Sequence, residues 1–307
     1  MAIRSSGTVA RQLSLRKREA LAGYLFIAPA VVGFVVFVAG PIAASLVFSL
    51  TEFRLIVPPR WTGLANYGML VRDPLFWQSL NVTTRYALAA LPLGLVCSLA
   101  LAILMNQKVR GIAFWRTVYY LPAVISGVAV AVLWTWILNP EFGLLNVLLR
   151  YVGVKGPHWL GNARTALPSL VLIGLWGVGG NMVIYLAGLQ GIPTELYEAA
   201  EIDGAGSTSR FTHITLPMLS PIIFFNLVMG LIGVFQFFTE PFVMTRGGPE
   251  NSTLTYMLYL YRNAFSYFRM GYASALAWVF FVLVFLLTLA VFRSSPVWVY
   301  YEARGGR

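Results

Sequence analysis

Residues 198–221 read EAAEIDGAGSTSRFTHITLPMLSP, a polar stretch that separates two apolar segments. Arg210 is the one basic residue between positions 195 and 217, against four acids: Glu195, Glu198, Glu201 and Asp203. Glycine and proline in this stretch predict turns and helix boundaries. The stretch raises the question of why so apolar a chain keeps a compact acidic loop.

The composition of the whole chain indicates a membrane protein. Of 307 residues, 58% are hydrophobic and only 11% are charged, with a mean hydropathy of +0.74. A soluble domain carries about 25% charged residues. The net charge of +11 does not indicate nucleic-acid binding, because no basic patch with interleaved aromatic residues occurs and Arg is expected at the ends of membrane segments.

Six segments are long and apolar enough to cross a bilayer, which takes about 20 residues. We therefore predict an all-α integral membrane protein with six transmembrane helices, at residues 21–50, 82–105, 112–138, 165–189, 218–244 and 271–292. The first segment is too long for a signal-peptide core and is expected to be retained. Pro29 and Pro41 are expected to kink it or to mark its ends.

Basic residues before the first span predict the orientation. The N-terminal tail carries Arg4, Arg11, Arg16, Lys17 and Arg18, and such a tail stays in the cytoplasm. Both termini and the loop between the fourth and fifth spans are then cytoplasmic. The predicted division is a tail at 1–20, a six-helix membrane domain at 21–293 with this loop at 191–217, and a tail at 294–307.

The loop begins with a predicted helix. Thr194 can cap a helix that starts near Glu195 and runs to Ile202. Three small or apolar side chains share one helical face with Asp203: Leu196, Ala199 and Ala200. This shallow face would let another protein approach closely, although a simple amphipathic connector would look the same.

A turn and a second short helix are predicted to follow. Gly204 lies where a helix end favours a residue with positive φ. Ser207 or Thr208 can cap the second helix, which carries Phe211 and Ile214. Pro217 is expected to stop it, and Pro221 suits the first turn of the next span.

The spacing of these residues resembles the cytoplasmic "EAA" loop of ABC-importer permeases. The matching residues are Glu198, Ala199, Ala200, Asp203, Gly204, Ala205, Ile214, Leu216 and Pro217. Two further regions, 116–146 and 244–281, look like the third-span region and the last outer loop and span of sugar-importer permeases. The chain is similar to the maltose-type and glycerol-3-phosphate-type importers, and specifically to the first permease of their usual pair.

The resemblance implies that different subunits carry out solute translocation and ATP hydrolysis. The chain would translocate a sugar or sugar-like solute, such as an oligosaccharide, a polyol or glycerol phosphate, across the inner membrane. Its partners would be a second, non-identical permease, two copies of a cytoplasmic ABC ATPase that hold ATP and Mg, an extracytoplasmic binding protein, and membrane lipid. Glu198, Ala199, Ala200, Asp203, Gly204 and Ala205 would contact the ATPase, while Phe211, Ile214, Leu216 and Pro217 would pack the loop onto the membrane helices.

The sequence itself gives no sign of catalysis, so we expect a protein that is not an enzyme and binds no cofactor. None of the three lysines follows a glycine, as a phosphate-binding P-loop requires. The single cysteine, Cys97, lies in an apolar run and permits no intrachain disulfide. His158 and His213 are far apart and are interpreted as solvated loop residues.

Polar residues in the fifth predicted span suggest a solute pathway, because polar groups at membrane depth are costly and often functional. On a continuous helix, one stripe of about 80° holds Asn226, Gly230, Gly233, Phe237 and Glu240, with Gln236 at its edge. Amides could bind sugar hydroxyls, and Phe237 could face a sugar ring. Glycine at this spacing is also typical of helix packing, so both interpretations stay open. Asn181 in the fourth span is a second polar candidate, and the glycines at 174–180 favour close helix contact or a bend.

Two other classes of membrane protein fit the sequence less well. An ion-coupled carrier would favour buried acids near the midplane and internal repeats, yet Glu240 is the one acid within a predicted span. A membrane enzyme would need a reactive cluster, which the sequence lacks.

Overall fold

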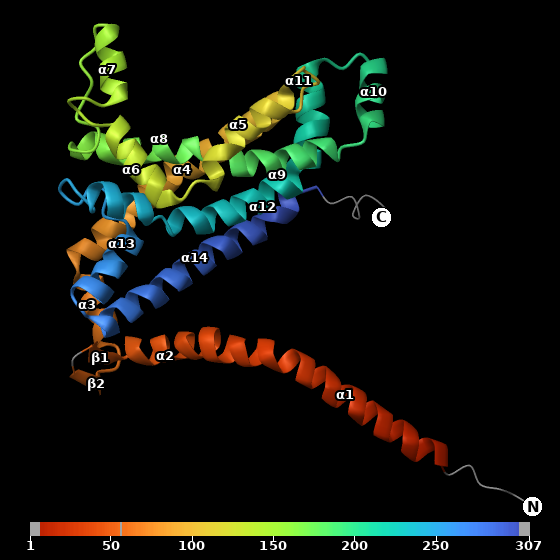
Figure 1. Cartoon of the computed structure of the whole chain (residues 1–307), viewed down its shortest axis with the longest axis vertical. Helices are drawn as coiled ribbons and strands as arrows, with labels where there is room; N and C mark the ends of the chain where they lie inside the picture. The colour runs from red at the N-terminus through yellow and green to blue at the C-terminus, as the bar shows by residue number, and fades with distance from the viewer. Residues whose placement is uncertain (1–6, 56, 301–307) are drawn as a thin grey trace, which may run out of the picture.

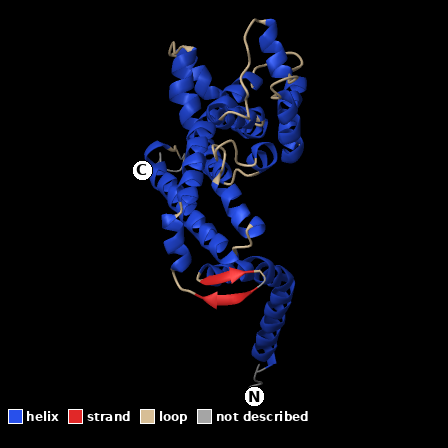
Figure 2. Ribbon diagram, turned by 90° about the vertical axis from the view of Figure 1, so that its left-hand side faces the viewer, coloured by secondary structure: helices blue, strands red, loops and turns tan. Residues whose placement is uncertain are grey.

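The computed structural model describes residues 7–55 and 57–300, and this part of the chain is predominantly helical (Figures 1 and 2). The outer parts of the two predicted tails, 1–6 with Arg4 and 301–307, lie outside the described residues. Four helices are long and apolar enough to cross a membrane, and two further pairs of helices qualify if each bent pair is one span. The described chain therefore has four to six membrane-spanning helices.

The first of these is a single long helical path of three elements: α1 (Gly7–Phe34), the π turn η1 (Val35–Ala39) and α2 (Gly40–Ser49). Pro41 does not end the path, because the wide π turn precedes it. Figure 1 shows α1 leading away from the other helices, and none of the most apolar window between Leu15 and Ser49 is buried. Its apolar surface must therefore be covered by lipid or by another chain.

A β-hairpin follows, which the all-helical prediction missed. Strands β1 (Thr51–Arg54) and β2 (Val57–Trp61) pair antiparallel, with Thr51 opposite Trp61 (Figure 2). The short helix α3 (Ala65–Arg72) comes next. The hairpin escapes sequence analysis because its strands are short and Pro58 and Pro59 occupy the second one, where proline is expected only at a sheet edge.

Helix α4 (Pro74–Met105) packs against α8, α9, α12 and α13. The last long helix, α14 (Met270–Trp298), packs on α2 and α12. Beyond its end, the backbone N–H of Tyr300 donates to Ser220 Oγ in α12 at 2.8 Å. The C-terminal end of α14 therefore lies beside the start of α12.

The predicted third and fourth spans are broken rather than straight. α5 (Ile112–Val124) and α6 (Gly127–Ile137) meet at 100°, and α8 (Ala163–Trp176) and α9 (Gly179–Gln190) meet at 45°. Ile125 is extended after a proline-containing last turn, which ends α5. At the second break, a Cβ on Gly179 would lie 1.9 Å from the carbonyl oxygen of Tyr119 in α5, so the glycine permits a close helix contact.

The predicted fifth span is displaced toward the N-terminus. α11 (Ser207–Arg210), the π turn η2 (Phe211–Thr215) and α12 (Leu216–Phe235) form one continuous helix of 29 residues. The helix ends at Phe235 and not at residue 244, which corrects the prediction. The chain then passes through a non-helical stretch into the π turn η3 (Pro241–Thr245), α13 (Tyr256–Tyr261) and the π turn η4 (Arg262–Ser266).

Two short helices lie across the direction of α8, α9 and α12, near opposite ends of these helices (Figure 1). α10 (Thr194–Ile202) lies between α9 and α11, near the C-terminal end of α14. α7 (Leu144–Tyr151) follows α6 at the far end, on the same side as α3 and α13.

Candidate functional site

The acidic loop forms the predicted helix, but Thr194 does not cap it. Helix α10 begins at Thr194 itself, with Pro193 as the preceding cap residue and no side-chain hydrogen bond. The fixed φ of proline already directs the chain into the helix. Helix α11 likewise starts at Ser207 after Gly206 without a side-chain cap, so the predicted caps Ser207 and Thr208 are also wrong.

The turn at Gly204 confirms the prediction. Gly204 has φ of +76°. Its N–H donates to the carbonyl of Glu201 at 3.0 Å, and the N–H of Ala205 donates to the carbonyl of Ala200 at 2.8 Å. These two bonds form a Schellman motif, which satisfies the last carbonyls of the helix. The chain reverses here with its backbone bonded internally.

Pro217 does not stop a second short helix, because the helix continues into the membrane. The π turn at Phe211–Thr215 directly precedes it, and the N–H of Leu216 donates to the carbonyl of Phe211. A wider turn accommodates the missing N–H and the ring of a proline. The loop and the fifth span are therefore one rigid helical unit.

Two polar contacts tie α10 to this unit. The hydroxyls of Tyr197 and Thr215 lie 2.9 Å apart. Arg210 Nη1 lies 3.2 Å from Glu201 Oε2. Tyr197 and Ile214 also pack against the buried cluster formed by α4, α9 and α12. A displacement of α10 would thus be transmitted to α12 through contacts as well as through the chain.

The outer surface of α10 is open to contact. No residue of α10 is buried. Among the residues predicted to meet an ATPase, Glu198, Ala199, Asp203 and Gly204 are exposed, while Ala200 and Ala205 are half-buried. Sequence analysis missed Ile202, whose side chain is 88% exposed at the end of the helix.

The residues predicted to pack the loop differ in burial. Phe211, Ile214 and Pro217 are half-buried, whereas Leu216 is 38% exposed. Leu216 therefore contributes less to the packing of the loop than the predicted role requires.

A cavity of about 150 Å³ lies between α4, α8, α9 and α12 and contains part of the predicted pathway. Its polar lining includes Tyr86, Asn181 and Asn226, and its glycines include Gly174 and Gly230. Asn226 is 2% exposed and donates its amide to the carbonyl of Ile222 at 3.0 Å. A Cβ on Gly230 would lie 2.6 Å from Leu91 Cδ1, so this glycine serves packing as well.

The rest of the predicted stripe is not brought to this cavity. Gly233 and Gln236 are exposed. Phe237 follows the end of α12 and does not line the cavity. Its ring stacks on that of Tyr86, a lining residue, with ring centroids 4.0 Å apart. Glu240 precedes η3 and is not among the residues that line the cavity. The stripe fails beyond Phe235 because the helix ends there, and it fails within α12 at Gly233, which is exposed.

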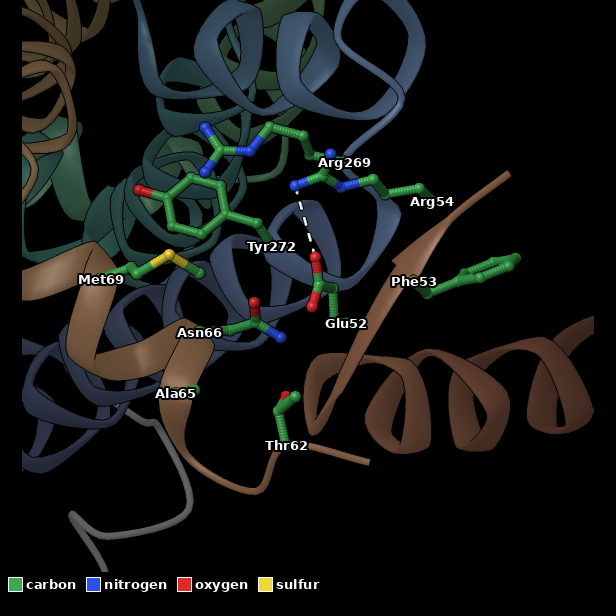
Figure 3. A pocket seen from close by; sticks show the side chains of 9 residues that line it. All are labelled: Glu52, Phe53, Arg54, Thr62, Ala65, Asn66, Met69, Arg269 and Tyr272. Carbon is green, nitrogen blue, oxygen red and sulfur yellow. Dashed lines mark ion pairs between the residues drawn. The ribbon is translucent and has the colours of Figure 1, made fainter. Parts of the chain in front are cut away.

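A second cavity, of about 280 Å³, lies at the far end between the hairpin, α3 and α14 (Figure 3). Arg54 pairs with Glu52 at 3.3 Å, and the guanidinium of Arg269 lies 5.0 Å from the ring centroid of Tyr272. Asn66 donates to the carbonyls of Ser49 and Thr51 at 2.8 and 2.9 Å. The Asn66 bonds hold the start of β1 against α3, and an isolated backbone bridge between Arg54 and Arg269 joins β1 to the residue before α14.

Asp73, beside this cavity, joins three elements and was missed by sequence analysis. It accepts hydrogen bonds from the hydroxyls of Tyr259 and Tyr272, the latter at 2.7 Å, and from the N–H of Leu75 at 2.9 Å. Burial raises the pKa of Asp73, but these bonds outweigh it and hold the pKa below its ordinary value. The Asp-Pro pair that opens α4 is a helix-start signal that could have revealed this residue.

The arrangement offers positioning rather than reactive chemistry. Within residues 7–55 and 57–300, no three His, Cys, Asp or Glu side chains lie together as metal ligands would. What the structure presents is an exposed acidic loop coupled to a span, and a polar cavity beside the same span.

Comparison with known proteins accounts for nearly the whole chain. A family model described as "Binding-protein-dependent transport system inner membrane component" matches residues 90–296. The chain is 47% identical to the probable ABC transporter permease protein YesP of Bacillus subtilis (strain 168), with 95% of each chain covered. It is 36% identical to the lactose transport system permease protein LacF of Rhizobium radiobacter, over 92% of this chain and 96% of that one.

A solved structure has the same fold. It is that of a bacterial ABC transporter involved in the import of the acidic polysaccharide alginate, with a TM-score of 0.83, 25% identity, and 93% of this chain and 98% of that one covered.

Proposed function

The chain belongs to the family of binding-protein-dependent transport inner-membrane components and is a permease subunit of an ABC sugar importer, and from this premise we propose that α10 couples solute translocation to ATP hydrolysis on a separate subunit. As a member of this family it is a multi-pass inner-membrane protein and a translocation subunit rather than an enzyme. The work of an ATPase must then reach the membrane helices through a physical contact.

The observation that carries the proposal is the combination of exposure and attachment at α10. Its acidic surface is open, while Tyr197 and Arg210 bind it to the helix that enters the membrane. A partner that held the exposed face could therefore pull on α12 as a lever. Movement of two such loops, one on each permease, would switch the pair between outward-open and inward-open states. Both termini and this loop would then face the cytoplasm in a chain of six spans.

The solute would pass beside the polar lining of the cavity between α4 and α12. Tyr86, Asn181 and Asn226 supply hydroxyl and amide groups, which suit the hydroxyls of a sugar. The cavity is smaller than typical ligand sites of about 300–1,000 Å³, so we infer that it is one wall of a pathway completed by the second permease. A sugar or sugar-like solute is proposed, delivered by an extracytoplasmic binding protein.

The remaining partners follow from the same proposal. They are a related second permease and two copies of an ABC ATPase, which would carry ATP and Mg. The exposed first span is compatible with the expectation of a second membrane subunit. None of its most apolar window is buried within the chain, so this surface is free to contact another subunit.

The first experiment is purification of the tagged chain from its native host in mild detergent, followed by identification of what accompanies it. Recovery of an ATPase and a second permease is expected, with ATP hydrolysis that depends on solute and binding protein. Recovery of this chain alone, with transport that needs no ATP, would instead favour an ion-coupled carrier.

A further inference from the structure

Helix α7 and the loop that follows it form a segment with no role in the proposed coupling. α7 follows α6 near the end of α8, α9 and α12 opposite to α10, and it lies across the direction of α8 and α9 (Figure 1). If the long helices run across the bilayer, α7 lies roughly in the plane of its surface. This position makes the chemistry of its exposed face informative.

Helix α7 carries apolar side chains on its exposed side as well as on its inward side. Leu144, Leu148 and Tyr151 fall within about 60° of one another on the helix, and their side chains are 49%, 54% and 85% exposed. Val152, directly after the helix, is 74% exposed. The apolar stripe thus points away from the chain.

The inward side of α7 carries two half-buried leucines, Leu145 and Leu149, and one buried polar residue. Asn146 is 3% exposed, and its amide nitrogen donates to the carbonyls of Pro140 and Pro157 at 3.1 and 3.3 Å. Its amide oxygen accepts from the indole N–H of Trp159 at 2.7 Å. The polar group is satisfied within the protein, so the outward apolar stripe is a stable feature of the fold. Such a stripe in water would be unfavourable by about 25 cal/mol per Å² of apolar surface.

Exposed apolar residues also precede α7 in the chain, on α6, which with α5 forms a bent pair apolar enough to be one membrane span. Val128, Val132 and Trp136 are spaced as one helical face and are 53%, 58% and 56% exposed. Phe142, 56% exposed, lies between α6 and Leu144 in the chain. Aromatic residues such as Trp136 and Tyr151 are typical of the membrane–water interface. Exposed apolar side chains therefore occur along the chain from α6 to α7, with aromatic residues suited to that boundary.

Charges near α7 complement a phospholipid surface. Arg150, Lys155 and Arg164 are exposed, against one acid, Glu141, in the same segment. Long basic side chains can keep an apolar stem in the interface while the charge reaches a phosphate group.

We propose that α7 is an interfacial helix that inserts Leu144, Leu148 and Tyr151 into the headgroup–acyl boundary of the outer leaflet, with Arg150 and Lys155 on lipid phosphates. It fixes the depth and rotation of the bent α5–α6 pair, which cannot be held in the bilayer as a straight span. The occupant of the stripe is lipid, and the role is independent of the proposed coupling through α10.

The test uses nitroxide labels on the full-length chain, in the complex with which it purifies, reconstituted in nanodiscs of mixed zwitterionic and anionic phospholipid. Cys97→Ser removes the native thiol, and Leu148→Cys and Tyr151→Cys then supply the labelled positions. Glu141→Cys is the matched control, on the same segment but outside the apolar stripe. Collision with oxygen, which concentrates in the bilayer, is compared with collision with a water-soluble nickel complex.

The expected result is an oxygen-to-nickel collision ratio several-fold higher at 148 and 151 than at 141. A ratio at 148 and 151 equal to that at 141 would place the stripe in water and overturn the proposal. Shielding of both labels from oxygen and nickel alike would mean that a protein surface covers the stripe, and would also overturn it. Two labelled positions keep the test decisive where one variant does not fold.

Discussion

Helices α7 and α10 are similar in length and in setting but opposite in surface chemistry. Each lies across the direction of α8, α9 and α12 near one end of these helices, and each leaves one face uncovered (Figure 1). The exposed face of α7 carries Leu144, Leu148 and Tyr151, whereas that of α10 carries Glu195, Glu198 and Glu201. The two helices therefore have a similar local geometry but expose different side-chain chemistry.

The chemistry of the exposed face, rather than the fold, therefore distinguishes α7, which is proposed to face lipid, from α10, which is proposed to bind a protein. Lipid demands no particular arrangement of polar groups, so α7 can be uniformly apolar on its outer face. A protein partner needs a defined shape, which α10 supplies through its small residues and its closed turn at Gly204. The isolated Ile202, 88% exposed among acids, fits a specific contact better than immersion in lipid.

Gly204→Val has the largest expected effect and tests whether the turn after α10 is needed for coupling. A Cβ here meets nothing within 4 Å, so the penalty comes from the positive φ alone. That conformation costs an L-residue about 1–2 kcal/mol, and such a penalty lowers the ratio of folded to unfolded loop by about 5- to 30-fold. We expect normal membrane insertion and a loss of solute-stimulated ATP hydrolysis, measured in reconstituted importer.

Gly206→Val is the matched control for that experiment. A Cβ added at Gly206 would also meet nothing within 4 Å, but the φ of Gly206 is −70°. Wild-type activity is expected for this variant. Normal transport by Gly204→Val would refute the requirement for the turn, and equal loss in both variants would indicate that the loop tolerates no added side chain.

The turn at Gly204 shows which features of the fold can be predicted from the sequence. Gly204 was predictable because a positive φ at a helix end is a local requirement of the backbone. The end of α12 at Phe235 was not, because the predicted span continues for another nine residues and the stacking of Phe237 on Tyr86 is a contact between distant segments. The 100° bend after Val124 was hidden for the same reason, since hydropathy reports composition and not direction.

Long-range contacts set the other limit. Asp73 meets two tyrosines nearly 200 residues away in the chain, and no local pattern encodes that meeting. Asn226 was identified as costly at membrane depth, and the structure brings it to a cavity; Gly233 and Gln236, identified by the same periodicity, are exposed instead. Periodicity places residues on one helical face, but it does not say which of them reach a cavity, and it ends where the helix ends.

Asn226→Ala tests whether the cavity between α4 and α12, which lies between the positions of α7 and α10, belongs to the solute pathway. The loss of one buried amide that bonds a solute hydroxyl would cost about 0.5–1.5 kcal/mol, or roughly a two- to tenfold rise in the solute concentration needed for half-maximal transport. ATPase binding at α10 should not change, which would separate the pathway from the coupling loop. Transport by proteoliposomes with labelled solute measures the first quantity, and co-purification measures the second.

Gln236→Ala is the control, because Gln236 is exposed and lies beyond the end of α12. It should leave transport unchanged. If neither variant alters transport, the cavity is not on the pathway. An effect of Gln236→Ala as large as that of Asn226→Ala would instead restore the pathway beyond Phe235.

Tyr197→Phe examines how firmly α10 is attached. The variant removes the hydroxyl that lies 2.9 Å from Thr215 and keeps the ring that packs under the loop. The expected cost is about 1 kcal/mol, seen as roughly fivefold faster hydrogen exchange of α10 amides. Tyr267→Phe, at a side chain that is 57% exposed, should leave α10 exchange unchanged. Unchanged exchange in Tyr197→Phe would mean that the ring, rather than the hydroxyl, holds α10.

The smallest expected effect separates attachment from docking at the same acid. Arg210 and Glu201 form a largely exposed pair, which contributes about 0–1 kcal/mol and weakens with added salt. Arg210→Ala and Glu201→Gln each remove the ion pair, but only Glu201→Gln removes a charge from the exposed face of α10. If the acids of α10 meet an ATPase, Glu201→Gln should weaken ATPase binding more than Arg210→Ala does, as measured by titration of the ATPase onto immobilised permease. Equal weakening would confine Glu201 to holding the loop, and the contrast between an acidic docking helix and an apolar lipid-facing one would then depend on Glu195 and Glu198 alone.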